Sequence, residues 1–436
     1  MALAIITSKV SNGRLEGTVK VPQSKSLLHR YLILSGLSKY HPLIVCTNNS
    51  DDIMATKRCL VDLGLIEKES APVHEDGIYR LDCGESGSTY KFLMPIVSTF
   101  NKTCRYRLGG KLVYNPLEGF YRVLRSHGVR REVLRADEVE VSGQLTAGTF
   151  ILPGYTDAQS ISGLLMALPL LEENSTVMVE KKIQSEAYVN MTIELMRAAG
   201  VKVNVIGNQS KFSRVYKVEG SQHYSVSVDT DIEGDWSLAA YWLVGAAISG
   251  GRVTCTNMDV ESLQGDRYIL NILDAFGANL RIKWHEEPDG WSGGRDIFWT
   301  DITVEGGDLY GIMLDGEDIP DLIPQVVLLA CAAEGTTVIK NVGSLRLGES
   351  GRIKNIVKVI NNLGGRIYES NNCLIIEGNG ADGLVGGIVR AHNDHRIAMM
   401  AAVAAGICSD EVIIEGADAV SKSYPDFFEV LEGMKT

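Results

Sequence analysis

Six stretches of the chain share one pattern of polar and hydrophobic positions, in which a short polar segment leads directly into a run of apolar and small residues. These stretches begin at Val21, Glu85, Asp157, Gly234, Ile319 and Asn393. Each run is too apolar for an exposed helix, so the pattern predicts six buried helices with polar N-termini. The starts lie roughly 60–90 residues apart, which indicates an internally repeated fold. We expect these helices to lie inside sheets and to direct their polar starts at a common cleft.

The segments between these stretches predict strands and further helices, most of which end at a glycine. The further helices are expected at 51–63, 117–127, 188–199, 265–276, 351–363 and 426–434. The resulting order of strand, helix, strand, helix, strand and strand is predicted three times in each half of the chain. Residues 284–297, rich in tryptophan, aspartate and glycine, predict an exposed hairpin. The second series begins near residues 229–233, where we place the break between the halves.

Composition narrows the class of protein. A chain of 436 residues exceeds one ordinary hydrophobic core, which favours two domains. A hydrophobic content of 45% with only 7% aromatic residues is typical of an α/β protein. The formal net charge of −12 argues against nucleic acid and anionic membranes as partners. Any anionic substrate therefore needs a local cluster of cations.

Cysteine usage and hydropathy bear on the compartment. The eight cysteines are scattered, without a CxxC or a Cys/His spacing typical of metal ligands, which predicts reduced thiols in a cytoplasmic protein and no metal site. The first residues, MALAIITSKV, lack the basic segment of a secretory signal, so we expect none. The longest apolar run, 323–333, is broken by Pro324 and Gln325 and is too short to span a bilayer.

The first stretch suggests the chemistry that the polar starts perform. Lys25, Ser26 and Arg30 lie within about one turn of the predicted helix start. Free backbone N–H groups and the positive end of the helix dipole lie there too, so the position suits a polyanionic ligand. A helix capped by Ser24 or Ser26 with solvated charges accounts for the same residues. The recurrence of polar starts along the chain favours the ligand site.

Taken together, the polar starts resemble those of the 5-enolpyruvylshikimate-3-phosphate synthase family of enolpyruvyl transferases. The resemblance lies in the segments 21–36, 84–92, 185–188, 233–242, 319–321, 349–352, 393–398 and 422–428, of which Asn-Asp-His-Arg at 393–396 and Lys-Ser-Tyr-Pro-Asp at 422–426 are the most specific. It implies a two-domain α/β fold in which each domain contains three βαβαββ repeats around buried helices, an inside-out α/β barrel. The implied domains are residues 1–20 with 232–436, and residues 21–231.

The resemblance also implies a reaction and its site residues. The enolpyruvyl group of phosphoenolpyruvate passes to the 5-hydroxyl of shikimate 3-phosphate and phosphate is released, without a metal or organic cofactor. The implied phosphoenolpyruvate-binding residues are Lys25, Gly87, Gln159, Arg352, Arg396 and Lys422. The implied acceptor-binding residues are Ser26, Arg30, Gln159, Ser185, Tyr188 and Asp321. Asp321 and Glu349, assisted by Lys25, are the implied proton carriers. Because the cations come from both halves, we expect domain closure to assemble the site of a monomeric protein.

Each assignment has a purely structural alternative. As a structural residue, Asp321 caps its helix, since aspartate is common at that position. Glu349 and Arg352, three residues apart, can form an exposed helical ion pair. Tyr188 can be a packing residue, and His395 an orienting or core histidine rather than a base. The order of the motifs along the chain favours function for Lys25, Asp321 and Arg396.

The chain departs from the family pattern at several positions. Asn115 stands where an arginine is expected, Gly348 where a lysine is usual, and Ser344 where an asparagine is common. Asp157 stands in place of a serine of the expected phosphate cradle. A carboxylate in place of a hydroxyl donor repels a phosphate, and the absent lysine removes a counter-charge. These two changes call the site for the 3-phosphate into question.

Three readings therefore remain open at the level of the sequence. The first is the shikimate-pathway synthase with a rewired site. The second is a paralogous enolpyruvyl transferase that uses another, unphosphorylated hydroxyl acceptor. The third is a non-catalytic protein that keeps the fold and binds an anion, against which the retained Lys25, Asp321 and Glu349 argue. The related UDP-N-acetylglucosamine enolpyruvyl transferase fits less well, because its loop cysteine has no counterpart in 108–122.

Overall fold

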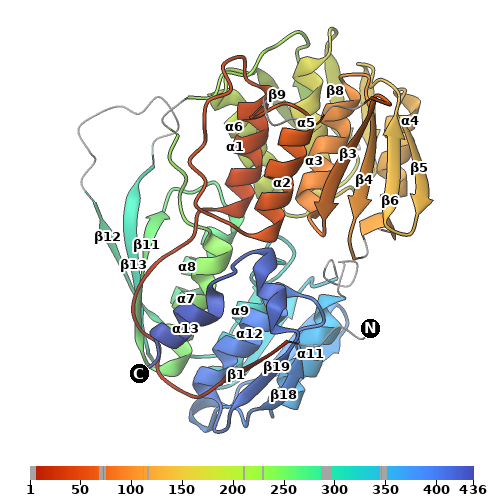
Figure 1. Cartoon of the computed structure of the whole chain (residues 1–436). Coiled ribbons are helices and arrows are strands. Elements are labelled where there is room, and N and C mark those ends of the chain that lie inside the picture. The colour runs from red at the N-terminus through yellow and green to blue at the C-terminus, as the bar shows by residue number, and fades with distance from the viewer. Residues whose placement is uncertain are drawn as a thin grey trace. The chain divides into compact units, whose positions relative to one another are not determined.

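The computed structural model describes residues 6–67, 72, 75–110, 112–114, 117–209, 212–227, 230–285, 297–343, 345 and 351–436 (Figure 1). The chain divides into two compact units. The first unit comprises Met1–Ser24, Glu233–Asp289 and Ile297–Thr436, and the second unit comprises Lys25–Ile232. The first unit is therefore discontinuous in sequence, with the second unit inserted after its first two strands.

The first unit contains three sheets. One has the order β12-β13-β11-β2 and is formed by β2 (Glu16–Lys20), β11 (Arg252–Asp259), β12 (Asn279–Trp284) and β13 (Trp299–Glu305). The next, β14-β15-β17-β16, is formed by β14 (Met313–Asp315), β15 (Thr336–Lys340), β16 (Arg366–Ser370) and β17 (Cys373–Glu377). The third, β1-β19-β18, joins β1 (Thr7–Val10) to β18 (Gly387–Arg390) and β19 (Val412–Glu415). The second strand of the chain thus pairs in parallel with β11, more than 230 residues later.

Three helices that pack on one another form the centre of the first unit: α7 (Trp236–Ser249), α9 (Ile323–Ala332) and α12 (His395–Ala404). The sequence of α7 is apolar on every face, and all its residues from Trp236 to Ile248 except Ser237 are buried. A helix without a polar face has to be enclosed, which explains its place inside the sheets. The amphipathic helices α8 (Ile269–Phe276), α11 (Arg352–Asn362) and α13 (Phe427–Gly433) complete the unit.

The second unit contains two sheets of four strands. The sheet β3-β4-β6-β5 is formed by β3 (Ile78–Gly84), β4 (Thr103–Leu108), β5 (Arg130–Arg135) and β6 (Glu138–Ser142). The sheet β7-β8-β10-β9 is formed by β7 (Thr149–Leu152), β8 (Ser175–Val179), β9 (Val203–Gln209) and β10 (Phe212–Val218). The helices are α1 (Lys25–Leu37), α2 (Asp51–Asp62), α3 (Gly87–Ser98), α4 (Glu118–Ser126), α5 (Ala158–Ala167) and α6 (Glu186–Ala198). Figure 1 shows α1, α2 and α3 side by side, with the β3 sheet along their flank.

The predicted fold class, an α/β protein of repeated βαβαββ units with buried helices, is confirmed. Four of the six expected βαβαββ repeats have the full order of elements, and the other two depart from it. In the described part of the chain the pair α1–α2 has no sheet of its own, and the last sheet of the first unit has three strands. Most of the predicted hairpin at 284–297 lies outside the described residues, although the strands that flank it, β12 and β13, are antiparallel.

Among the helices that the structure describes, none is both long and apolar enough to cross a membrane. The six apolar runs that the pattern singled out instead fill the interiors of the two units. Helix α1, for example, is buried from Leu27 to Gly36.

Gly163 allows α3 and α5 to approach closely, and replacing it should cost stability. A Cβ atom at this position would lie 2.2 Å from the backbone oxygen of Lys91, a separation that requires the helices to move. We expect Gly163→Ala to lower the free energy of unfolding by roughly 1–3 kcal/mol, as measured by urea denaturation. Gly433→Ala is the control, because nothing lies within 4 Å of a Cβ atom there. Equal stability of the two variants would show that the helices do not touch as described.

Candidate active site

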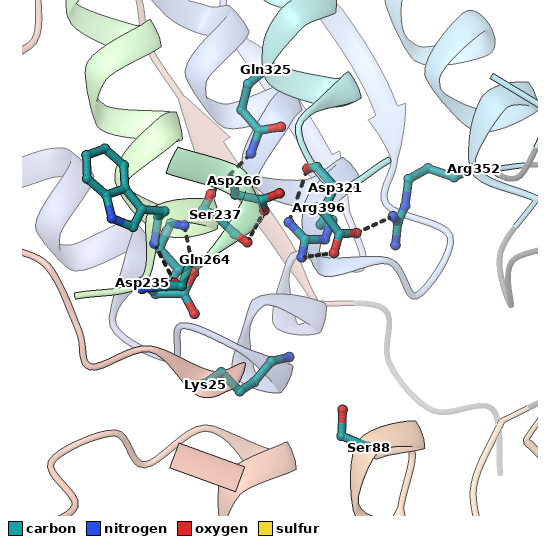
Figure 2. Close-up of polar contacts among 12 residues, drawn as sticks. Lys25, Ser88, Asp235, Ser237, Gln264, Asp266, Asp321, Gln325, Arg352 and Arg396 are labelled. Carbon is teal, nitrogen blue, oxygen red and sulfur yellow. Dashed lines mark hydrogen bonds and ion pairs between the residues drawn. The ribbon is translucent and has the colours of Figure 1, made fainter. Parts of the chain in front are cut away.

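The starts of the three central helices of the first unit lie together (Figure 2). Asp235 caps α7 by accepting from the backbone N–H of Leu238, and Asp394 caps α12 by accepting from the N–H of Arg396. Asp321 lies in the turn that leads into α9. Ion pairs and hydrogen bonds connect these starts to one another, as described below. The three polar helix starts of this unit thus lie together, and the common cleft for all six starts stays a prediction.

Asp321 lies between two arginines from different helices. Its Oδ1 is 3.1 Å from Nη1 of Arg352, and its Oδ2 is 3.0 Å from Nη2 of Arg396. Arg396 also donates through Nη1 to the backbone oxygen of Asp321 at 3.2 Å. Nε of Arg352 in turn lies 2.9 Å from Oδ2 of Asp394. Two guanidinium groups and two carboxylates thus form one continuous network, which we call the Asp321 cluster.

The environment of Arg352 keeps its guanidinium group charged. Burial disfavours the charged form of Arg352, but Asp394 and Asp321 outweigh it and raise the pKa of the guanidinium above its ordinary value. The side chain of Asp321 remains 31% exposed, compared with 19% for Arg352 and 11% for Arg396. The carboxylate of Asp321 is therefore the most accessible of these three groups to a ligand.

Local sequence explains why Asp321 precedes α9 and does not occupy its N-cap position. Pro320 precedes it, and α9 begins only at Ile323 with Pro324 in its first turn, which suits proline because the missing N–H is not needed there. The position that caps α9 is Leu322, whose side chain makes no capping hydrogen bond. The alternative that Asp321 is merely a helix cap is thus not supported by its position.

Four polar residues behind the Asp321 cluster were not among the predicted site residues. Gln264 accepts from the N–H of Trp236 at 3.1 Å, and its amide donates to the backbone oxygen of Gly234 at 2.8 Å. Gln325 of α9 donates to the backbone oxygen of Ser237 at 3.2 Å, and the Ser237 hydroxyl bonds to Asp266. The motif Gln-Gly-Asp at 264–266 offered a signal, a glycine between two polar residues, but its partners are distant in sequence.

In the second unit, the starts of α1, α2, α3 and α5 also carry connected polar groups. Lys25 Nζ lies 2.7 Å from Oδ2 of Asp52 at the start of α2. The amide of Gln159 donates to the Ser88 hydroxyl at 2.9 Å, which connects α5 to α3. Gly87, predicted to contact phosphoenolpyruvate, is the first residue of α3, where backbone N–H groups are free to bind an anion.

Arg30 is buried and organises the predicted acceptor-binding residues of this unit. Its Nε donates to the Thr192 hydroxyl at 2.7 Å, and its two terminal nitrogens donate to the backbone oxygens of Ser26 at 2.7 Å and Tyr188 at 2.9 Å. Burial lowers the pKa of Arg30 to about 10, so the guanidinium stays charged at neutral pH. Most of the N–H donors of Arg30 therefore form hydrogen bonds within the protein, and those to Thr192 and Tyr188 connect α1 to α6.

Ser185 precedes α6 in a strained backbone conformation. Its φ angle is 54°, in the left-handed region that residues with a side chain rarely adopt. Such conformations persist where the surrounding structure enforces them, and they concentrate at functional sites. The contact of Ser185 with the acceptor stays a prediction.

Asp157, the departure from the family's phosphate cradle, has partners of its own. One carboxylate oxygen accepts from the backbone N–H groups of Gln159 and Ser160, and the other accepts from the Ser160 hydroxyl at 2.9 Å. Lys91 Nζ of α3 lies 3.3 Å from the first oxygen. Burial favours the neutral acid, but Lys91 and the donors from Ser160 outweigh it and lower the pKa of Asp157. The negative charge at the start of α5 is thus matched by a lysine that the motifs did not identify.

The remaining predicted residues are placed only in part. Lys422 ends the short 3₁₀ helix η7 (Ala417–Lys422) of the first unit. Glu349, Gly348, Ser344 and Asn115 lie outside the described residues. Within the described part of the chain, no group of three acidic, histidine or cysteine side chains is arranged to hold a metal ion. An open depression of about 890 Å³ beside α6, lined by Arg197, Lys202 and Lys217 among others, contains none of the predicted residues.

Comparison with solved structures identifies the class of fold. EPSP synthase from Acinetobacter baumannii aligns with a TM-score of 0.76 at 23% identity, covering 99% of this chain and 98% of that chain. The enolpyruvyl transferase NikO from Streptomyces tendae aligns with a TM-score of 0.69 at 16% identity, covering 99% and 97%. The chain therefore has the fold of the enolpyruvyl transferases.

Sequence comparison identifies the family. Residues 10–431 match the family model of EPSP synthase (3-phosphoshikimate 1-carboxyvinyltransferase). Proteins named 3-phosphoshikimate 1-carboxyvinyltransferase from Clostridium botulinum and Clostridium kluyveri are 35% and 36% identical. The alignments cover 97% and 95% of this chain, and 96% and 94% of those proteins. The chain belongs to the EPSP synthase family, as its motifs predicted.

Proposed function

We propose that this protein transfers the enolpyruvyl group of phosphoenolpyruvate to the 5-hydroxyl group of shikimate 3-phosphate and releases phosphate, a step of aromatic amino-acid biosynthesis. Family membership over nearly the whole chain supports the reaction. The observation that carries the proposal is the Asp321 cluster, in which a partly exposed carboxylate lies between two guanidinium groups that are less exposed than it is. Phosphoenolpyruvate needs such cations for its carboxylate and phosphate, and the transfer needs a carboxylate to move protons.

The proposed chemistry requires balanced proton transfers. The methylene carbon of phosphoenolpyruvate takes a proton, and the acceptor oxygen bonds to the neighbouring carbon and loses its own proton. The bond from that carbon to the phosphate oxygen then breaks, and loss of a proton from the new methyl group restores the double bond. We assign these transfers to Asp321 and Glu349 with the assistance of Lys25; the role of Glu349 rests on the sequence resemblance alone.

The proposed contacts with phosphoenolpyruvate rest on the family resemblance, and the cations and N–H donors near helix ends support them. Arg352, Arg396, Lys422 and Lys25, with the N–H of Gly87 and the amide of Gln159, bind phosphoenolpyruvate. Each charge-assisted hydrogen bond contributes about 1.5–3 kcal/mol. An incoming anion must share Arg352 and Arg396 with Asp321, which weakens their hold on that carboxylate and leaves it better able to accept a proton.

For the acceptor, we assign Ser26, Arg30, Gln159, Ser185, Tyr188 and Asp321 to binding. A paralogue with an unphosphorylated acceptor was suggested by the carboxylate of Asp157 at the expected phosphate cradle. The ion pair with Lys91 reduces the force of that argument, because the repulsion that a phosphate would meet is offset by an adjacent cation. Shikimate 3-phosphate therefore remains the proposed acceptor.

An acceptor panel tests the proposal. The protein is incubated with phosphoenolpyruvate and either shikimate 3-phosphate, shikimate or no acceptor, and released phosphate is measured. We expect release with shikimate 3-phosphate and only background release in the other two reactions. Release with shikimate but not with its 3-phosphate would instead identify the paralogue. Background release in all three reactions would support a non-catalytic protein.

Closure of the two units is a further prediction. The proposed ligand-binding residues are divided between the units, with Lys25 in the second and Arg352 and Arg396 in the first. Simultaneous contact of both groups with substrate therefore requires the units to close. We expect the radius of gyration of a monomer, measured by small-angle scattering, to decrease when both substrates are saturating. An unchanged scattering profile under these conditions would argue against a site shared by the units.

The state of the cysteines supports a proposed cytoplasmic location. All eight are free thiols, and six of them are buried. Proteins of oxidising compartments commonly use cysteines in disulfides, whereas reducing compartments keep them as thiols.

A further inference from the structure

Asp266 is a buried carboxyl group that the proposed mechanism does not use. It lies in the short 3₁₀ helix η4 (Gly265–Tyr268) and is 2% exposed. Its Oδ2 shares a hydrogen bond with the hydroxyl of Ser237, in the first turn of α7. Figure 2 shows its carboxyl group next to Arg396 and Asp321, with which it interacts electrostatically. When a buried acid next to the Asp321 cluster ionises, it adds a negative charge to the surroundings of the cluster.

Hydrogen bonds fix Asp266 to the elements that carry the Asp321 cluster. Gln325, on the helix that follows Asp321, donates to the backbone oxygen of the same Ser237 that bonds to Asp266. Gln264, two residues before Asp266, holds the start of α7 through the N–H of Trp236. The position of Asp266 is therefore set by α7 and α9 together rather than by a flexible surface loop.

The charged groups around Asp266 favour its neutral form. Burial is the largest influence, and the carboxylates of Asp321 and Asp235 add to it, whereas Arg396 and the Ser237 hydroxyl oppose it. Together they raise the pKa of Asp266 to about 7. On its own element, Arg267 donates to the backbone oxygen of Val260. On α8, which packs against η4, Asp274 is exposed.

We propose that Asp266 is a positioning residue of the phosphoenolpyruvate site, whose loss of a proton adds a negative charge beside the neutral Asp321 cluster and so weakens the binding of the anion. Arg352 and Arg396 carry two positive charges, and Asp321 and Asp394 carry two negative charges, so these four groups sum to zero. Ionised Asp266 adds one further negative charge beside Arg396, so these five groups then sum to −1. The proposal rests on the proposed function, since it concerns the same substrate.

Asp266→Asn is the matched variant, because an amide has the shape of the acid and cannot ionise. We expect the wild type and the variant to bind phosphoenolpyruvate with similar affinity near pH 5.5. Above neutral pH, the affinity of the wild type should fall about tenfold relative to the variant, the effect of one pK unit of coupling. The ratio of the two affinities is the readout, because the phosphate of the ligand titrates in the same range and its effect cancels.

A second readout follows Asp266 without any ligand. Its pKa is raised on folding, so the stability that its protonated form provides is complete at low pH and is lost as pH rises through about 7. The melting temperature of the wild type should therefore fall relative to Asp266→Asn between pH 5.5 and 8.5. Asp274→Asn, which removes an exposed carboxylate from the neighbouring helix, is the control and should follow the wild type in both measurements.

The two measurements separate the possible failures. The two measurements are calorimetric titration with phosphoenolpyruvate alone and thermal unfolding over this pH range. They support the proposal if the affinity ratio and the difference in melting temperature between wild type and variant both change with pH. A constant affinity ratio or a constant difference in melting temperature overturns it. If phosphoenolpyruvate does not bind the wild type at any pH, the proposal for Asp266 fails, whereas the acceptor panel, which supplies both substrates, decides the proposed function separately. A melting difference that still changes with pH then shows that Asp266 ionises as described but does not act on the binding of this anion.

Discussion

Replacing Asp321 by alanine is expected to lower turnover by about 10²–10⁴-fold, the usual contribution of a general acid or base. The carboxylate lies between Arg352 and Arg396 and is partly exposed, so its loss removes a proton carrier without opening a cavity in the core. The measurement is the steady-state rate of phosphate release with phosphoenolpyruvate and shikimate 3-phosphate, accompanied by a circular dichroism spectrum that verifies the fold.

Asp321→Asn separates catalysis from binding. The amide keeps the shape of the side chain but releases both arginines from their counter-charge, so phosphoenolpyruvate should bind at least as tightly as it binds the wild type. We expect a large decrease in kcat with an unchanged or lower KM for phosphoenolpyruvate. Near-normal turnover in either variant would show that Asp321 is a structural partner of the arginines and not a proton carrier.

The second large effect concerns the acceptor phosphate. Asp157→Ser combined with Gly348→Lys is expected to tighten the binding of shikimate 3-phosphate by roughly 10- to 150-fold, the equivalent of one charge-assisted contact of about 1.5–3 kcal/mol. Serine keeps the cap of α5, because it is a favourable N-cap residue, and it releases Lys91 from its ion pair. The measurement is the affinity for shikimate 3-phosphate by calorimetric titration.

Shikimate without the phosphate is the matched ligand for this test, and its affinity should not change in the double variant. Each single variant is measured as well, so that the contribution of the freed Lys91 is distinguished from that of the added lysine. Tight binding of shikimate 3-phosphate by the unmodified protein, with no gain in the double variant, would mean that these two positions do not face the phosphate.

The sequence was sufficient to predict the buried helices and their polar starts. Helix α7 is apolar on all faces, and a pattern of that kind has few structural outcomes. Asp321 was also predictable as a candidate, because the preceding Ile319-Pro320 and the following apolar run place it at a helix start. Both inferences depend only on residues that are close in the chain.

Contacts between distant segments could not be predicted in the same way. Lys91 lies within the apolar run of α3, and its pairing with Asp157 depends on the close approach of α3 and α5 at Gly163. The role of Asp266 depends similarly on where η4 packs against α7. The parallel pairing of β2 with β11 joins segments separated by most of the chain. Periodicity reports which residues are buried, but it does not report their partners.

The most direct test of the proposed reaction is the fate of the oxygen that bridges carbon and phosphorus in phosphoenolpyruvate. The substrate is labelled with a heavy oxygen isotope at that position and incubated with the protein and shikimate 3-phosphate, and the products are analysed by mass spectrometry. Enolpyruvyl transfer breaks the carbon–oxygen bond, so we predict all of the label in the released phosphate and an unlabelled enolpyruvyl ether. Label retained on the three-carbon product, with unlabelled phosphate, would show cleavage at phosphorus and would contradict it.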